Sequence, residues 1–125
     1  MEVPILLPKI FDYPLTYRVN KESLNVGDFV EAVNMCLGNQ NTYGEIFNIA
    51  SGKPVSIKYI TELVKSYIGK GIPKYGARPY RKGENMELYA DIKKIKNDIG
   101  WQPKTSLDRG LDKTVNWYLK KWKNL

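Results

Sequence analysis

The sequence predicts an α/β fold with about four helices and a few short strands. Segments of helical length, with apolar residues at three- and four-residue spacing, alternate with short apolar runs. Most of these segments are bounded by a capping residue or a glycine. An apolar content of 42% and a charged content of 26% are typical of a folded globular chain. Because 125 residues have room for one hydrophobic core, residues 1–125 are predicted to form a single lobe.

The chain opens with prolines at positions 4, 8 and 14, which favour extended or turn structure up to Thr16. Residues 24–37 then predict a short strand that leads into a helix. Asp28 lies near the start of this helix, where a carboxylate satisfies free amides or complements the helix dipole. The stripe expected to pack inward comprises Phe29, Val30, Val33, Cys36 and Leu37.

The middle of the chain predicts two short strands on either side of a helix. The run Ile46 to Ile49 reads as a buried strand, and Ile72 to Tyr75 as a second short strand. Between them, Ser56 is placed to cap a helix and Gly69 to end it. The core-facing stripe of this helix is expected to comprise Ile57, Ile60, Leu63, Val64, Tyr67 and Ile68.

Two further helices are predicted near the end of the chain. Asp91 has the position of a cap, Gly100 can take the left-handed terminating conformation, and Trp101 can fold back onto the helix between them. Ile92, Ile95 and Ile99 line one face of that helix. Ser106 caps the last helix, whose negative end has lysines nearby at 120, 121 and 123. The residues of the last helix expected to pack inward are Leu107, Leu111, Val115, Tyr118, Leu119 and Trp122.

The net charge of +7 belongs to the second half of the chain, since fifteen of the twenty Lys and Arg residues follow residue 62. Such a field attracts nucleic acid, anionic lipid or a phosphorylated small molecule, and charge alone does not choose among them. Cys36 is the only cysteine and there is no histidine, which excludes disulfides, Cys/His zinc sites and His-based triads within the chain. A reducing compartment fits, and the first ten residues are too short to span a bilayer, so the protein is predicted to be cytoplasmic.

The stretch from Arg78 to Asp91 has the composition of an anion site. The planar guanidinium groups of Arg78 and Arg81 are suited to gripping phosphate oxygens, and Gly83 lets the backbone approach closely. Glu84 offers an acceptor for a sugar hydroxyl. A solvated basic turn is the alternative interpretation of the same charges.

Three segments together resemble one family. Residues 47–60, 78–91 and 100–118 are similar, in order and approximate spacing, to the carboxyl-terminal part of nucleotide-sugar epimerases and dehydratases, which are extended short-chain dehydrogenases/reductases. The resemblance implies the substrate-binding lobe of an extended Rossmann-type enzyme without its N-terminal dinucleotide-binding part. It also implies a role in cell-surface polysaccharide biosynthesis.

The resemblance carries site roles onto particular residues. Arg81 matches an arginine that contacts the diphosphate of the nucleotide sugar, and Glu84 matches an acidic position that accepts from the ribose. Lys21 stands where the family has a second phosphate-binding arginine, and a lysine loses the bidentate geometry of a guanidinium. Arg18 substitutes only if the loop is re-routed, and Arg78 has either a helper role or none.

No catalytic residue is assigned in this chain. Tyr17 and Lys21 have the Tyr-x-x-x-Lys spacing of the superfamily's catalytic pair, but the pair requires a helix, whereas Pro14 and the following residues predict a strand and loop. No Gly-rich dinucleotide-binding turn occurs in the sequence. The chain is therefore expected to bind no cofactor alone.

The resemblance then implies that NAD or NADP belongs to the complete enzyme. The expected ligand is a nucleotide-diphosphate sugar, and the expected partner is a cofactor domain, the chain being a fragment or one half of a split enzyme. A lobe of this kind is expected to expose an apolar patch. The alternative function is a small basic, non-enzymatic module that binds nucleic acid or another phosphorylated ligand.

Overall fold

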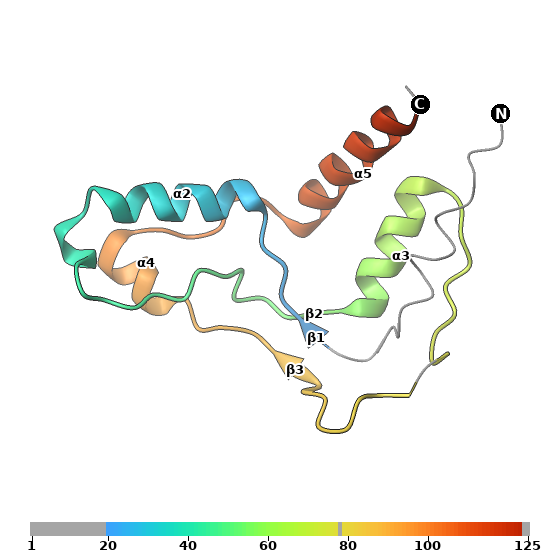
Figure 1. Cartoon of the computed structure of the whole chain (residues 1–125), viewed down its shortest axis with the longest axis horizontal. Helices are drawn as coiled ribbons and strands as arrows, with labels where there is room; N and C mark the ends of the chain where they lie inside the picture. The colour runs from blue at the N-terminus through green and yellow to red at the C-terminus, as the bar shows by residue number, and fades with distance from the viewer. Residues whose placement is uncertain (1–19, 78, 124–125) are drawn as a thin grey trace.

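The computed structural model describes residues 20–77 and 79–123 and has an α/β fold. Figure 1 shows one pair of helices, α2 and α4, on one side of a small sheet and a second pair, α3 and α5, on the other. The predicted extended structure before Thr16 lies outside the described residues. The elements in chain order are β1 (Asn20–Lys21), α2 (Val26–Leu37), the 3-10 helix η1 (Gln40–Thr42), β2 (Val55–Ser56), α3 (Ile57–Ile68), β3 (Glu87–Leu88), α4 (Lys93–Ile99) and α5 (Leu107–Lys123).

The sheet has three two-residue strands in the order β2-β1-β3. Strand β1 pairs antiparallel with β2 and parallel with β3, so that Asn20 lies opposite Ser56 on one side and Glu87 on the other. A further hydrogen bond of 2.8 Å joins the amide of Asn20 to the carbonyl of Met86. The sheet thus brings three distant parts of the sequence together beside the charged stretch.

The main core lies between α2, α4 and the turn that follows α4. Trp101 and Ile95 are each 1% exposed, Ala32 is fully buried, and Ile92 and Ile99 pack against this cluster. Gly100 takes the left-handed conformation with φ of 75°, which lets Trp101 fold back. The predicted face of this helix and its glycine stop are confirmed.

The second helix pair has the predicted ends. The Ser56 hydroxyl accepts the amide of Tyr59 at the start of α3, and Gly69 ends that helix with φ of 72°. The Ser106 hydroxyl accepts the amide of Arg109 in the first turn of α5. Helices α3 and α5 contact each other. The predicted α3 stripe is half-buried at all of its six positions.

Two predicted inward stripes are wrong in part. On α5, Val115 is buried, but Tyr118, Leu119 and Trp122 are exposed. On α2, Ala32 and Asp28 face the core, whereas Phe29, Val30 and Leu37 are exposed. The spacing of apolar residues showed that each helix has an apolar face, but it did not show that this lobe leaves part of that face uncovered.

Neither predicted middle strand forms a ladder within the described residues. Residues 46–49 and 72–75 belong to no strand, and Ile46 and Ile72 are each 85% exposed. A strand exists only when a second strand satisfies its backbone, and no described segment pairs with either run. Both strand predictions are therefore wrong for this lobe.

Asp28 lies in the first turn of α2, where its charge complements the helix dipole as predicted, and its carboxylate also makes contacts beyond the helix. Asn25 caps α2, whereas the Asp28 carboxylate, 5% exposed, accepts the amide of Thr105 at 2.9 Å and its hydroxyl at 3.1 Å. The indole of Trp101 donates to the Asp28 carbonyl at 3.1 Å. Asp28 therefore fixes the connection between α4 and α5. Among the described helices, none is both long and apolar enough to cross a membrane.

Candidate functional site

Two of the predicted ligand-binding residues meet at the sheet. Lys21, on β1, approaches Glu84, in the loop before β3, with 3.2 Å between Nζ and Oε1. The two residues are 63 positions apart in the sequence. The Lys21 side chain is 43% exposed and that of Glu84 is 15% exposed, so the pair lies at the surface with its carboxylate partly sheltered.

A tight turn joins Arg81 to Glu84 of this ion pair. The amide of Glu84 donates to the carbonyl of Arg81 at 3.0 Å, and Gly83 between them has φ of 78°. A left-handed residue at this position favours glycine, so the predicted need for Gly83 has a conformational cause. Arg81 is exposed and forms no ion pair with any described residue. Arg18 and Arg78 lie outside the described residues.

Glu22 is a central residue that the sequence analysis missed. Its Oε2 accepts the amide of Gly52 at 2.9 Å and the hydroxyl of Ser51 at 3.4 Å, while Oε1 accepts the amide of Ala90 at 3.1 Å. One carboxylate therefore joins the end of β1 to a turn before β2 and to the chain after β3. The only signal in the sequence was an acidic residue beside Lys21, which does not reveal partners so far away.

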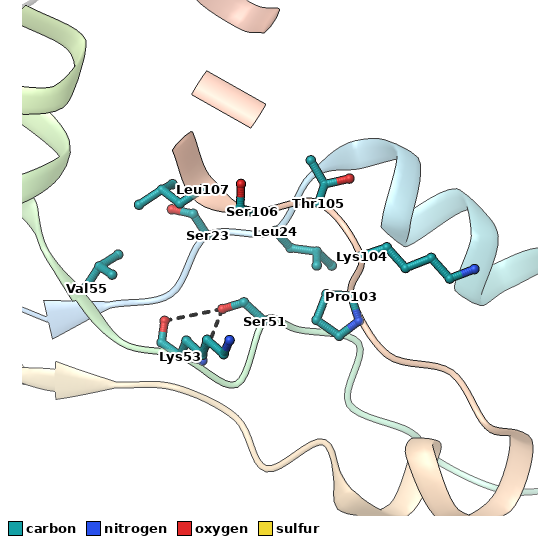
Figure 2. Close-up of a pocket in the computed structure, with 10 residues that line it drawn as sticks. All are labelled: Ser23, Leu24, Ser51, Lys53, Val55, Pro103, Lys104, Thr105, Ser106 and Leu107. Atoms are coloured by element: carbon teal, nitrogen blue, oxygen red, sulfur yellow. Dashed lines mark hydrogen bonds between the residues drawn. The ribbon is translucent and has the colours of Figure 1, made fainter. Parts of the chain in front are cut away.

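A cavity of about 320 Å³ lies between the chain after β1, the turn before β2 and the connection from α4 to α5 (Figure 2). Of the predicted ligand-binding residues that the structure describes, Lys21, Arg81 and Glu84, none lines it. Its polar groups mostly have protein partners: Ser51 bonds Lys53, Thr105 bonds Asp28, and Lys104 pairs with Glu31 on α2. We therefore place the candidate site at the sheet and not in this cavity.

The shifted tyrosine and glutamate pKa values belong to residues outside this site. Burial, followed by the hydrogen bond to Glu62, raises the pKa of Tyr75 to about 12. The hydrogen bond and charge of Lys94 lower the pKa of Glu45. Within the described part of the chain, no cluster of three or more His, Cys, Asp or Glu residues is suited to holding a metal ion. The sheet site therefore offers a cation, a guanidinium and a carboxylate, groups that bind an anion with hydroxyls rather than a metal.

Comparison with known proteins identifies the family. The model of the GDP-mannose 4,6 dehydratase family matches residues 18–114. The chain is 30% identical over 115 residues to an uncharacterized protein of Methanocaldococcus jannaschii, covering 92% of this chain and 35% of that protein. It is 37% identical over 98 residues to a putative UDP-glucose 4-epimerase of the same organism, covering 78% of this chain and 30% of that one.

A solved structure agrees with these sequence matches. The UDP-glucose 4-epimerase of Thermotoga maritima, solved with UDP-glucose, superposes with a TM-score of 0.72 and 29% identity over 85% of this chain and 33% of that chain. Fold and sequence thus both match part of the nucleotide-sugar epimerases and dehydratases. The chain belongs to the nucleotide-sugar epimerases and dehydratases of the extended short-chain dehydrogenase/reductase family.

The matches cover most of this chain but only part of each relative. The chain spans about a third of the length of the curated relatives it matches. The predicted family and α/β fold are confirmed. The ligand roles of Arg81, Glu84, Lys21, Arg18 and Arg78 stay predictions.

Proposed function

We propose that this chain is the lobe of an NAD-dependent epimerase or dehydratase that binds the nucleotide-diphosphate sugar. One observation carries the proposal. The fold brings Lys21 within 3.2 Å of Glu84 across 63 positions, at a turn that begins with the exposed Arg81. A cation, a guanidinium and an acceptor are the groups that a diphosphate linked to a ribose requires.

The proposed roles follow from which atoms are already engaged. Lys21 contacts Oε1 of Glu84, and no described residue donates to Oε2 of that carboxylate. Glu84 therefore has one oxygen with which to accept a ribose hydroxyl while keeping its ion pair. The Arg81 guanidinium is assigned to the diphosphate. Arg18 and Arg78 are proposed as additional cations for the same group.

The reaction requires a second lobe. The UDP-glucuronic acid 4-epimerase of Bacillus cereus was solved with NAD and UDP-glucuronic acid, and the dTDP-glucose 4,6-dehydratase of Bacillus anthracis with NAD. By analogy, we propose that NAD or NADP binds to a dinucleotide-binding lobe and exchanges hydride with the sugar. The isolated chain is expected to turn over no nucleotide sugar. We further propose a cytoplasmic role in the biosynthesis of cell-surface polysaccharides, for which the family supplies the support.

Titration calorimetry with UDP-glucose tests this function. Arg81→Ala should weaken binding by roughly 1.5–3 kcal/mol, the scale of a hydrogen bond to a charged group. Arg81→Lys should recover part of the loss, since an ammonium retains the charge but not the fork. The matched control is Lys82→Ala, which removes the neighbouring exposed cation and should cost much less.

Two results would contradict the proposal. One is an unchanged affinity for UDP-glucose after Arg81→Ala in a protein whose circular dichroism is unchanged. The other is an equal loss for UDP-glucose and for an unrelated polyanion such as heparin, with steep salt dependence. That result would assign the charges to nonspecific polyanion binding.

A further inference from the structure

The outer face of α5 has a row of cations around one exposed tryptophan. Residues four positions apart follow one another along a single side of a helix. On α5 this row comprises Arg109, Lys113, Trp117 and Lys121, with Lys120 next to it in the last turns of the helix. We call these five residues the basic stripe. All of them are exposed, and Trp117 is 56% exposed.

The basic stripe lies on the side of α5 that faces away from the rest of the lobe. Figure 1 shows α5 at the edge of the lobe, and its helix neighbour is α3. At 3.6 residues per turn, the buried Val115 and the exposed Trp117 lie on opposite sides of α5. Burial, followed by the charges of Asp108 and Asp112, raises the pKa of Tyr67 on α3. The two acidic residues of α5 are therefore directed towards α3 and not towards the stripe.

No acidic side chain neutralises the basic stripe. None of its four cations takes part in an ion pair with any residue in the ranges 20–77 and 79–123. The Lys121 ammonium instead lies 4.9 Å from the ring centroid of Trp117, and the Tyr118 ring meets the same indole edge to face, with 4.8 Å between centroids. The indole is therefore held in an exposed position among positive charges.

The dipole of α5 accounts for only part of the basic stripe. Lys120 and Lys121 lie near the carboxyl end of the helix, where positive charge is stabilised. Arg109 lies in the first turn, where positive charge is disfavoured, and an exposed indole gains nothing from the dipole. A negatively charged partner gives a reason for both residues.

An anionic membrane surface fits the basic stripe better than a protein lobe or a nucleic acid does. Lysine is depleted from protein–protein interfaces, whereas lysines and arginines together with tryptophan are typical of helices that lie on membranes. From Arg109 to Lys121 the stripe runs about 18 Å along a convex helix at 1.5 Å per residue. Single-stranded nucleic acid is usually bound in a groove with a series of stacking rings. One indole suits the boundary between headgroups and acyl chains.

We propose that the basic stripe of α5 binds an anionic lipid surface, with its four cations on headgroup phosphates and the Trp117 ring between the headgroups. The inference is independent of the proposed nucleotide-sugar site, since the stripe contains none of Lys21, Arg81 and Glu84. It goes beyond that function by giving the lobe a position at a membrane surface.

Vesicle sedimentation of the whole chain tests the charge requirement. The chain should bind vesicles of phosphatidylcholine and phosphatidylglycerol in equal parts, leave vesicles of phosphatidylcholine alone unbound, and dissociate at high salt. Lys113→Gln combined with Lys121→Gln should weaken binding about 25-fold, because each cation near an anionic surface contributes about fivefold. The matched control combines Lys93→Gln with Lys96→Gln, which removes the same charge from exposed positions on α4 and should have little effect.

Tryptophan fluorescence tests which side of α5 meets the lipid. On the anionic vesicles the emission should shift to shorter wavelength, because an indole leaves water. Trp101 is 1% exposed, so its surroundings should not change. Trp117→Phe should remove the shift. Trp122→Phe should preserve it, since Trp122 lies on the same side of the helix as Val115.

Three results of these assays would overturn the inference. The first is no binding to the anionic vesicles by a chain whose circular dichroism shows that it is folded. The second is an equal loss of binding in the two double variants. The third is a fluorescence shift that Trp122→Phe removes and Trp117→Phe does not.

Other occupants of the basic stripe would also overturn it. Tighter binding to single-stranded DNA than to the anionic vesicles would identify a nucleic acid as the partner. A shift in emission that grows with protein concentration without vesicles would identify a second copy. The last occupant is tested by fusing this chain to the part of the Thermotoga maritima UDP-glucose 4-epimerase that it does not match. Failure of acrylamide to quench Trp117 in that fusion without vesicles would identify the other lobe.

Discussion

The contact between Lys21 and Glu84 makes a quantitative prediction about stability. At 3.2 Å the bare Coulomb attraction is about 1.3 kcal/mol in water and about 5 kcal/mol at an effective dielectric constant of 20. Because the Lys21 side chain is 43% exposed, solvent screening keeps the net value near the lower limit. We expect a coupling free energy of about 0.5–1 kcal/mol between the two side chains.

A double-mutant cycle with Lys21→Met and Glu84→Gln isolates this coupling. Urea unfolding of the four proteins at low salt gives the coupling energy, and the same cycle at high salt should give a smaller one. The control cycle uses Lys93→Met and Asp91→Asn, whose side chains are 3.7 Å apart and 86% and 66% exposed. That pair should show a coupling near zero, since both of its groups are well solvated.

The reasoning would be refuted if the Lys21 and Glu84 cycle gave no more coupling than the control cycle, or a coupling that did not fall with salt. The same contact also bears on ligand binding. Because Glu84 already neutralises part of the Lys21 charge, Lys21→Met should weaken UDP-glucose binding less than Arg81→Ala does. The reverse order would show that the ion pair opens when the ligand binds.

The remaining predictions concern a missed carboxylate and a shifted phenol. Glu22→Gln should lower the free energy of unfolding by roughly 1.5–3 kcal/mol, because a charged acceptor for two backbone amides is lost. The control is Glu87→Gln, at an exposed position, which should have little effect in the same urea assay. Burial and Glu62 raise the pKa of Tyr75 from 10.0 to about 12, so the stability that its neutral form contributes is complete below pH 10 and is lost as the pH rises towards 12. Absorbance titration of the phenolates should show one tyrosine that ionises at higher pH than the others. Tyr75→Phe should remove this high-pH step, and Glu62→Gln should move it to lower pH. If the high-pH step is unchanged in both variants, the assignment to Tyr75 is contradicted.

The parts of the fold that were predictable depend on local chemistry. Ser56, Gly69 and Gly100 act on amides and carbonyls within one turn of themselves, so their roles followed from the sequence and are confirmed. Glu22 could not be found in this way, because its partners lie 30 and 68 positions away and only the folded sheet brings them close. The same holds for the contact between Lys21 and Glu84: the family resemblance assigned each a ligand role, but nothing in the sequence predicted that they touch.

The two wrong strand predictions failed because side-chain exposure can alternate without backbone pairing. Residues 46–49 alternate between exposed and half-buried, with Phe47 and Ile49 packed on the core. Residues 72–75 alternate in the same way, since Ile72 is exposed and Pro73 is half-buried. Neither run pairs with another strand in the described part of the chain. A side-chain pattern shows only which side faces the protein, whereas a strand requires a second backbone as its hydrogen-bond partner.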